Sequence, residues 1–304
     1  MSKIPPSQFF PPVECATSDG ALVLGDAPFP ELVLDALIHG IFPWPATIGG
    51  FDEDYDEDCD EDYVVEDYDV ARSSSESAKR SSSWLAQQEA VEETRKIMLK
   101  SVSSEIWQAT WNRFSPSNLP TMREDNLDLI WWSPDPRAIY ELSSVHVPKR
   151  LARTIKSGKF VVTFDEAFCE VVLGCALAKE RSEEGSWITR EIYAAYCQLH
   201  KLGYAHSVEC WLQDEYSRGI RRLVGGLYGV AINGFFDGES MFSIETDASK
   251  VAFFALVDRI KARGFKLFDL QVLNAHTARL GGVEIPRDEY MRRLEDAAST
   301  PVRF

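Results

Sequence analysis

The chain has 304 residues, enough for one large domain or two ordinary ones, and its apolar and charged fractions are those of a soluble globular protein. No apolar run approaches the length that spans a bilayer, and Met1–Pro6 lacks the apolar core of a signal peptide. The net charge of −16 is concentrated in residues 52–69, which hold twelve acidic residues and no basic one. We therefore expect a cytoplasmic protein without a membrane span, whose other residues are close to charge balance and can carry a basic patch.

The six cysteines are scattered, and no two of them have a C-x-x-C or metal-type spacing. Scattered cysteines in a cytoplasmic chain usually pack as small core hydrophobes. We expect neither a disulfide framework nor a zinc site.

Residues 8–46 are a compact, proline-rich start. The apolar run Ala21–Leu24 follows a turn and predicts a short strand. Pro30–His39 has helical spacing, with proline in the tolerated first turn and Gly40 as a stop.

Residues 47–126 have a different composition. The acidic run and the serines of 73–83 cannot bury enough apolar surface to offset the entropy of ordering the chain. We expect a disordered, solvating insert over 47–83, followed by a helix over 84–100.

A basic cluster follows at Val147–Lys159. Lys149, Arg153 and Lys156 are spaced i, i+4, i+7 and therefore share one helical face, with Arg150 beside them. Such a face suits a phosphate backbone, and it equally suits an ordinary solvated helix.

The rest of the chain alternates helical and strand patterns, which indicates an α/β or α+β sheet domain over 146–297. Helices are predicted over 165–181, 191–202 and 249–263, and strands over 205–212, 224–232, 234–236 and from 267 onward.

The last of these strands contains the first candidate site. Asp269 and Gln271 interrupt an apolar run two residues apart, so a strand directs them to the same face. Burying a carboxylate costs free energy unless polar groups hydrogen-bond to it or pair with its charge. The pair indicates either an active site or an edge strand with one wet face.

Two glycine-rich segments precede it. Gly225–Gly229 lacks both the G-x-G-x-x-G spacing and a following Lys-Ser/Thr, so its glycines indicate close backbone approach and not a phosphate loop. In Gly238–Ser243, Glu239 could hold an ammonium group beside apolar Phe236 and Met241, or it could cap a loop. Because no serine-hydrolase elbow or histidine ligand set is present, positioned carboxylates favour direct transfer between two substrates.

Several motifs taken together are similar to one family, the leucyl/phenylalanyl-tRNA–protein transferases. The resemblance runs in order through nearly all of 8–46 and 127–292. Its segments are GIFPW (40–44), WWSPDPRA (131–138), GSWITR (185–190), HSVECW (206–211), GGLYGV (225–230), GESMFS (238–243) and DLQVLNAHTARLG (269–281).

The resemblance implies an N-terminal domain over 1–145, interrupted by the insert, and a catalytic domain of the GNAT acyltransferase fold with a mixed sheet over 146–304. It implies a monomer that moves Leu, Phe or Met from aminoacyl-tRNA to proteins beginning with Arg or Lys and marks them for degradation, without a cofactor or metal.

The resemblance also implies residue roles. Asp269 and Gln271 match the pair linked to proton relay, and Glu239 matches the acid that contacts the aminoacyl amine. The implied aminoacyl pocket is formed by Trp131, Trp132, Trp187, Leu227, Phe236 and Met241, and the implied tRNA contacts are Lys149, Arg150, Arg153 and Lys156.

The chain departs from the family at two places. About eighty residues separate the Phe-Pro-Trp and Trp-Trp segments, which the family joins almost directly, and Ala275 stands where an acidic residue is usual. A non-catalytic binder of basic protein N-termini or of tRNA is the alternative hypothesis.

Overall fold

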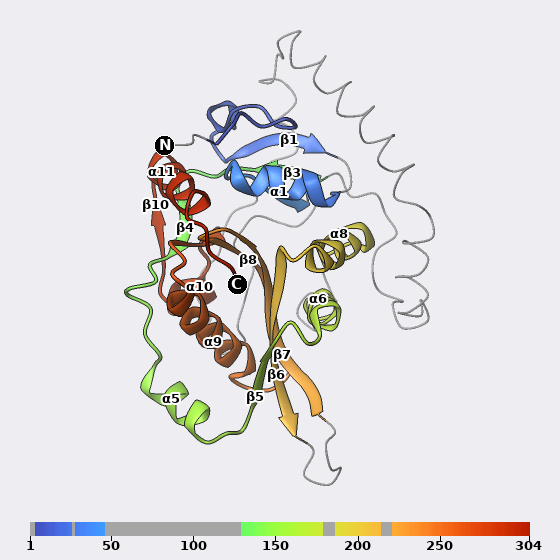
Figure 1. The fold of residues 1–304 in the computed structure, drawn as a ribbon, viewed down its shortest axis with the longest axis vertical. Coiled ribbons are helices and arrows are strands. Elements are labelled where there is room, and N and C mark those ends of the chain that lie inside the picture. The colour runs from blue at the N-terminus through green and yellow to red at the C-terminus, as the bar shows by residue number, and fades with distance from the viewer. Residues whose placement is uncertain (1–3, 26–27, 46–128, 179–185, 214–220) are drawn as a thin grey trace, which may run out of the picture.

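The computed structural model describes residues 4–25, 28–45, 129–178, 186–213 and 221–304, which form two β-sheets and their covering helices (Figure 1). The predicted insert at 47–126, with its disordered part and its helix, lies outside the described residues.

The smaller sheet unites both sides of the insert. Its strands are β1 (Ala21–Gly25), β2 (Phe42–Pro45) and β3 (Leu129–Trp132), arranged β1-β3-β2 with both pairs antiparallel. A 3-10 turn, η1 (Val13–Cys15), precedes them, and helix α1 (Pro30–Ile38) buries Val33 and Leu37. The strand and helix predicted in this region are confirmed.

The larger sheet has seven strands, and its order is β10-β4-β9-β8-β7-β6-β5. All neighbours are antiparallel except β8 and β9, which run parallel. The strands are β4 (Arg137–Tyr140), β5 (Val161–Phe164), β6 (Ala205–Gln213), β7 (Arg221–Ile232), β8 (Phe235–Ser243), β9 (Leu267–Gln271) and β10 (Gly282–Ile285). The mixed α/β class is confirmed.

The chain crosses from the small sheet to the large one between Trp132 and Arg137. The sequence placed a boundary later, at residue 145, and the division into domains stays a prediction.

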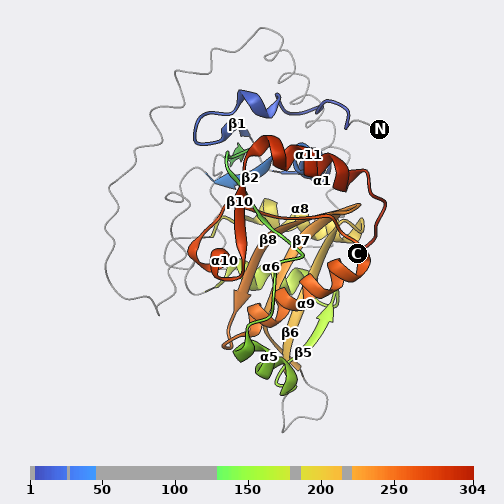
Figure 2. The same cartoon turned by 90° about the vertical axis from the view of Figure 1, so that its left-hand side faces the viewer.

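Helices cover both faces of the large sheet (Figures 1 and 2). α6 (Phe168–Ala176), α8 (Arg190–Lys201) and α11 (Arg287–Ala298) pack with α1 into one hydrophobic cluster, called here the α8-side core. α5 (Lys149–Lys156) and α9 (Ala248–Arg263) contribute to a second cluster, the α9-side core, and α10 (Ala275–Arg279) packs beside β10. Among the described residues, no helix combines the length and apolarity needed to cross a bilayer.

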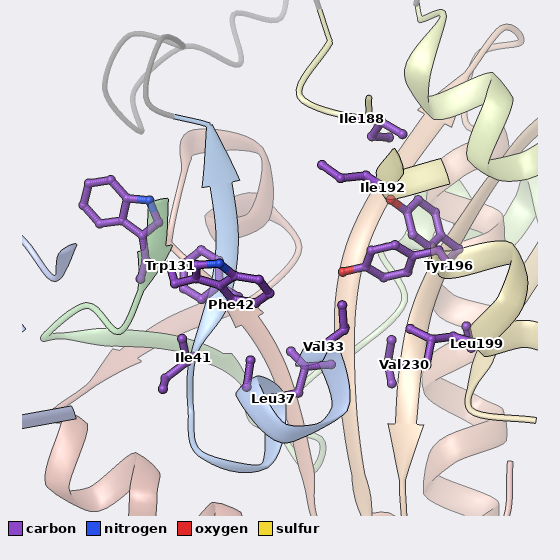
Figure 3. Close-up of a cluster of buried hydrophobic side chains, with 14 of the residues drawn as sticks. Val33, Leu37, Ile41, Phe42, Trp131, Ile188, Ile192, Tyr196, Leu199 and Val230 are labelled. Carbon is purple, nitrogen blue, oxygen red and sulfur yellow. The ribbon is translucent and has the colours of Figure 1, made fainter. Parts of the chain in front are cut away.

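The α8-side core joins the N-terminal segment to the large sheet. Figure 3 shows Val33 and Leu37 of α1 facing Leu199 of α8 and Val230 of β7. All four side chains are at most 1% exposed. Because one dry cluster contains both segments, separating them would expose this apolar surface to water.

The glycines of β7 allow the close approach that the sequence predicted. A Cβ on Gly226 would lie 2.7 Å from the carbonyl oxygen of Val208, and one on Gly229 would collide with the backbone of Asp237. The pairing of β7 with β8 shifts register at this point, between Tyr228 and Gly229.

Two cysteines depart from the expectation that all would pack as free thiols. Cys169 of α6 and Cys197 of α8 are joined as a disulfide, with their Cα atoms 5.9 Å apart. They are 28 residues apart in sequence, and only the packing of the two helices brings them together. Cys175 and Cys210 lie outside this disulfide and are buried, as expected, whereas Cys15 is exposed.

Candidate active site

Strand β9 lies inside the large sheet, between β4 and β8, and all five of its residues are buried. Phe268 and Leu270 belong to the α9-side core and Leu267 to the α8-side core. Strand alternation therefore directs Asp269 and Gln271 together toward the α8 side. The predicted shared face is confirmed, and the alternative of a wet edge strand is wrong.

Asp269 is held by four donors. Arg137 donates from Nε to Oδ1 at 3.0 Å and from Nη2 to Oδ2 at 2.6 Å. The hydroxyl of Tyr290 donates to Oδ2 at 2.6 Å, and the backbone N–H of Gln271 donates to Oδ1 at 2.8 Å. Each carboxylate oxygen thus accepts two hydrogen bonds, which leaves little acceptor capacity for another proton donor.

Arg137 connects this carboxylate to the N-terminal segment. Its Nη1 donates to the carbonyl of Gly40 at 3.0 Å, and its guanidinium lies between the rings of Phe42 and Tyr290, at 4.6 and 4.7 Å. The side chain is 1% exposed. Burial alone would lower the pKa of Arg137, but the charge of Asp269, the hydrogen bonds to it and the nearby Tyr290 and Asp237 together raise the pKa overall.

Gln271 ends β9 in an unusual backbone conformation. Its φ of 68° is in the left-handed region, where a non-glycine residue is uncommon. The bond from its N–H to the side chain of Asp269, two residues earlier, is an Asx-type turn that supports this conformation. Asp269 thereby fixes where the Gln271 side chain begins.

The amide of Gln271 reaches two carboxyl groups on β8. Its Nε2 donates to Oδ2 of Asp237 at 3.1 Å and to Oε2 of Glu239 at 3.2 Å. The Tyr196 hydroxyl of α8 donates to Oε1 of Glu239 at 2.6 Å. Because Glu239 lies within β8 and is 8% exposed, the reading of this residue as a loop cap is wrong.

Burial shifts the acidity of this group. It raises the pKa of Asp237 well above its usual range, and the nearby charges of Glu239 and Asp269 add to the effect. Burial also raises the pKa of Glu239, although hydrogen bonds from Tyr196, Asp237 and Gln271 oppose the rise. Burial and the charge of Glu239 raise the pKa of Tyr196.

Four residues of this network were not predicted: Arg137, Tyr196, Asp237 and Tyr290. Asp237 could have been found, because it precedes Glu239 by two residues on a strand, as Asp269 precedes Gln271. Arg137 lies in the quoted WWSPDPRA motif, but its partner is 132 residues away. The tyrosines gave no signal in the sequence that distinguished them from core aromatics.

The six residues predicted to form the aminoacyl pocket do not lie on one side of the large sheet. Trp131, Trp132 and Trp187 pack in the α8-side core, whereas Leu227, Phe236 and Met241 pack in or against the α9-side core. Trp187 stacks on Trp44 at 5.6 Å, and the Trp132 indole donates to the Trp44 carbonyl at 3.4 Å. The Trp131 ring packs on Phe10 at 4.9 Å.

The predicted basic face is present on α5, where Lys149, Arg150, Arg153 and Lys156 are all exposed. Both views place α5 at the opposite end of the molecule from α11, whose Tyr290 contacts Asp269 (Figures 1 and 2). Thr154 of α5 donates to Asp247, at the start of α9, at 3.3 Å. The basic face and the carboxyl groups are therefore separate regions.

Fold and site together define a mixed α/β protein whose central sheet holds a buried centre of three carboxyl groups, one amide and one arginine. Within the described ranges, no three His, Cys, Asp or Glu side chains are grouped so as to hold a metal ion.

Comparison with known proteins agrees with the resemblance seen in the sequence. The model of the leucyl/phenylalanyl-tRNA protein transferase family matches residues 139–295, about half of the chain. The chain is 46% identical over 176 residues to the protein of that name from Nitratidesulfovibrio vulgaris, which covers 58% of this chain and 72% of the relative. The corresponding protein from Gloeobacter violaceus is 46% identical over 176 residues (58% and 85%), and that from Yersinia pestis 44% over 174 residues (57% and 70%). The chain belongs to the leucyl/phenylalanyl-tRNA–protein transferase family.

Proposed function

We propose that this protein transfers Leu or Phe, and also Met, from aminoacyl-tRNA to the α-amino group of proteins that begin with Arg or Lys, and so marks them for degradation. Family membership supports the reaction class. The observation that carries the proposal is the Gln271 amide, fixed between Glu239 and Asp237 at the end of a strand that lies in the matched region.

The transfer reaction requires the enzyme to orient its two substrates more than to activate the ester. A tRNA ester is already reactive, so the neutral amine of the acceptor attacks the ester carbon and the ribose oxygen leaves with a proton. The protein must place the two substrates in line and stabilise the oxygen that becomes negative. A preorganised amide donor and a charged carboxylate supply such groups.

We assign Asp269 the role of an orienting group and counter-charge. Its two oxygens already accept from Arg137, Tyr290 and the Gln271 backbone, which argues against a role as general base. Gln271 then presents its amide to the reacting groups, and Glu239, which keeps slight exposure, holds the amine of the aminoacyl group.

We propose that the tryptophans form the wall for the aminoacyl side chain. Trp132 and Trp187 pack in the same core as Tyr196, the partner of Glu239, and an apolar wall rejects polar side chains through the cost of desolvating them. Leu227, Phe236 and Met241 would support the sheet from the α9 side. Because size alone discriminates weakly, Met should be accepted.

The exposed α5 face is proposed to bind the tRNA, since clustered lysine and arginine neutralise phosphates. A monomer and a cytoplasmic location stay predictions.

A transfer assay tests the function. The full chain is incubated with radiolabelled Phe-tRNA and a peptide that begins with Arg, and the label on the peptide is counted. A matched peptide that begins with Ala is the control. We expect label on the Arg peptide and little on the Ala peptide. No label on either peptide, with tRNA or peptide binding retained, would establish the non-catalytic binder instead.

A further inference from the structure

Asp237 accepts a hydrogen bond from the Gln271 amide and lies at the centre of the site, but it is assigned no chemical role in the transfer. It pairs with Asp269 in the parallel register of β8 and β9 and is fully buried. The Gln271 amide donates to both Asp237 and Glu239, so these two carboxyl groups lie close together. Three carboxyl groups, Asp237, Glu239 and Asp269, therefore share a region that contains one buried arginine, Arg137.

The N–H groups of Arg137 already donate to other partners. Arg137 gives two N–H groups to Asp269 and one to Gly40, and no hydrogen bond from it reaches Asp237 or Glu239 in the part of the chain that the structure describes. Among the described residues, the Asp237–Glu239 pair thus has no cation hydrogen-bonded to it. Two like charges this close and this buried do not both ionise readily, so the pair keeps a proton.

The hydrogen bonds indicate which member carries the proton. Glu239 accepts from Tyr196 on one oxygen and from Gln271 on the other, as suits an ionised carboxylate. Asp237 accepts from Gln271 on Oδ2 only, and its buried Oδ1 has no hydrogen-bond partner among the described residues. An ionised Asp237 would leave a buried charged oxygen without a donor, whereas a neutral Asp237 carries no charge there, and its side-chain hydrogen bond with Glu239 places the proton between the two carboxyl groups.

We propose that Asp237 is a positioning residue that shares a single proton with Glu239, remaining the neutral acid so that Glu239 alone is the anion that meets the aminoacyl amine. The proposal rests on the proposed function for the identity of that amine. It extends the function by giving the site a proton-dependent state: loss of the shared proton places a second negative charge beside the Gln271 amide.

The groups that face Asp237 determine the pH at which this proton is lost. Burial raises the pKa of Asp237 most, and the anionic groups Glu239 and Asp269 raise it further. Arg137 acts in the opposite direction. The tyrosines of the neighbouring helices interact with it as well, and burial raises the pKa of both; they are Tyr196 and Tyr290.

The first test needs no activity. Because the native pKa of Asp237 lies above the unfolded value, the shared proton favours the folded state at low pH, and this contribution is lost as pH rises through the native pKa. The denaturation midpoint of the full chain should therefore fall with rising pH more steeply than that of Asp237→Asn.

Infrared difference spectra of the wild type and of Asp237→Asn should show a protonated carboxyl band that only the wild type has. Asp258→Asn, an exposed aspartate on α9, is the matched control and should follow the wild type. Parallel midpoints for wild type and Asp237→Asn, with no such band, would overturn the shared proton.

The second test measures the pH profile of Phe transfer. The wild type should lose rate on the alkaline side as the pair loses its proton, about tenfold per pH unit beyond the transition, and Asp237→Asn should lack this decline. An unchanged alkaline decline in Asp237→Asn would overturn the positioning role. A wild type that transfers no label at any pH would reject the proposed function and this role with it, and the infrared band would still decide whether the two carboxyl groups share a proton.

Discussion

At the scale of single residues, the site depends on how one buried cation is distributed among three carboxyl groups. Arg137 pairs with Asp269, its guanidinium lies between the rings of Phe42 and Tyr290, and both charged side chains are buried. Removing one partner of such a pair leaves a buried charge without compensation, which is far more costly than removing both. Asp269 is therefore a structural residue, in addition to the orienting role that we propose for it.

This distribution predicts strong coupling between the two residues. Arg137→Met should lower the free energy of unfolding by about 3–5 kcal/mol, because Asp269 stays buried without its cation. Adding Asp269→Asn should recover part of the loss, with a coupling energy of about 1–3 kcal/mol in a double-mutant cycle measured by denaturant unfolding. Additive effects of the two substitutions would contradict the ion pair.

A second acid predicts the opposite pH dependence from Asp237. Asp165, at a φ of 62°, accepts from His206 at 2.9 Å and from the backbone N–H of Ser207 at 2.9 Å. Burial alone would raise the pKa of Asp165, but these hydrogen bonds lower it overall. A lowered pKa stabilises the fold above the unfolded value and ceases to do so as pH falls through the native value.

Asp165→Asn should therefore cost about 1 kcal/mol near neutral pH, and the cost should shrink on acidification. Asparagine tolerates the left-handed conformation, so the substitution isolates the charge. Unfolding midpoints measured over an acid pH series check this. A difference that grows toward acid would show that the hydrogen bonds do not favour the carboxylate.

At the scale of elements, α5 offers a test of its own because its basic side chains are exposed and far from the carboxyl groups. Neutralising Lys149 and Arg153 together should weaken tRNA binding and reduce the slope of log affinity against log salt by about 1–2. The transfer rate at saturating tRNA should change little. Lys261→Gln, an exposed lysine on α9, is the control. Equal losses in control and variant would mean that α5 is an ordinary solvated face.

Hydrophobic periodicity was sufficient to predict elements such as α8 and β6, because each repeats with a clear period along the sequence. Hydrophobic periodicity did not predict contacts between partners that lie far apart in the sequence. The position of β3 between β1 and β2, and the contact of Arg137 with Asp269, depend on pairings between residues far apart in the chain. The Cys169–Cys197 disulfide was missed for the same reason.

The candidate site was predicted in part. Asp269, Gln271 and Glu239 carry polarity into apolar strands, which is visible in a sequence, and the structure brings them together. The apolar pocket was predicted less well, because the residue type alone does not say which face of a sheet a hydrophobe occupies. Leu227 and Phe236 therefore lie on the other side from the tryptophans.

At the scale of the whole molecule, the N-terminal segment is part of the site and not an appendage. Gly40 and Phe42 contact Arg137, and the strand that completes their sheet enters only after the insert. The acidic run at 52–69 therefore lies in the chain between β2 and β3, two strands that pair with each other. Twelve carboxylates tethered to a tRNA-binding protein oppose the approach of phosphates.

Deleting residues 50–83, which include the whole acidic run, should tighten tRNA binding, most strongly at low salt where charge repulsion is least screened. A Gly/Ser segment of the same length in place of 50–83 separates charge from chain length and should have the same effect. Binding that is unchanged across a salt series would show that the insert does not compete with tRNA.

We propose that the Gln271 amide, held by Asp269 and the carboxyl pair, positions the reacting groups for the transfer. The most direct test of this role is the single-turnover rate of Phe transfer at saturating tRNA, measured for the wild type and for Gln271→Ala. We predict a fall of about 10²–10³-fold in rate with the tRNA Kd unchanged, because only positioning and charge stabilisation are lost. A Gln271→Ala protein that transfers Phe at the wild-type rate would contradict the assignment of this network as the active site.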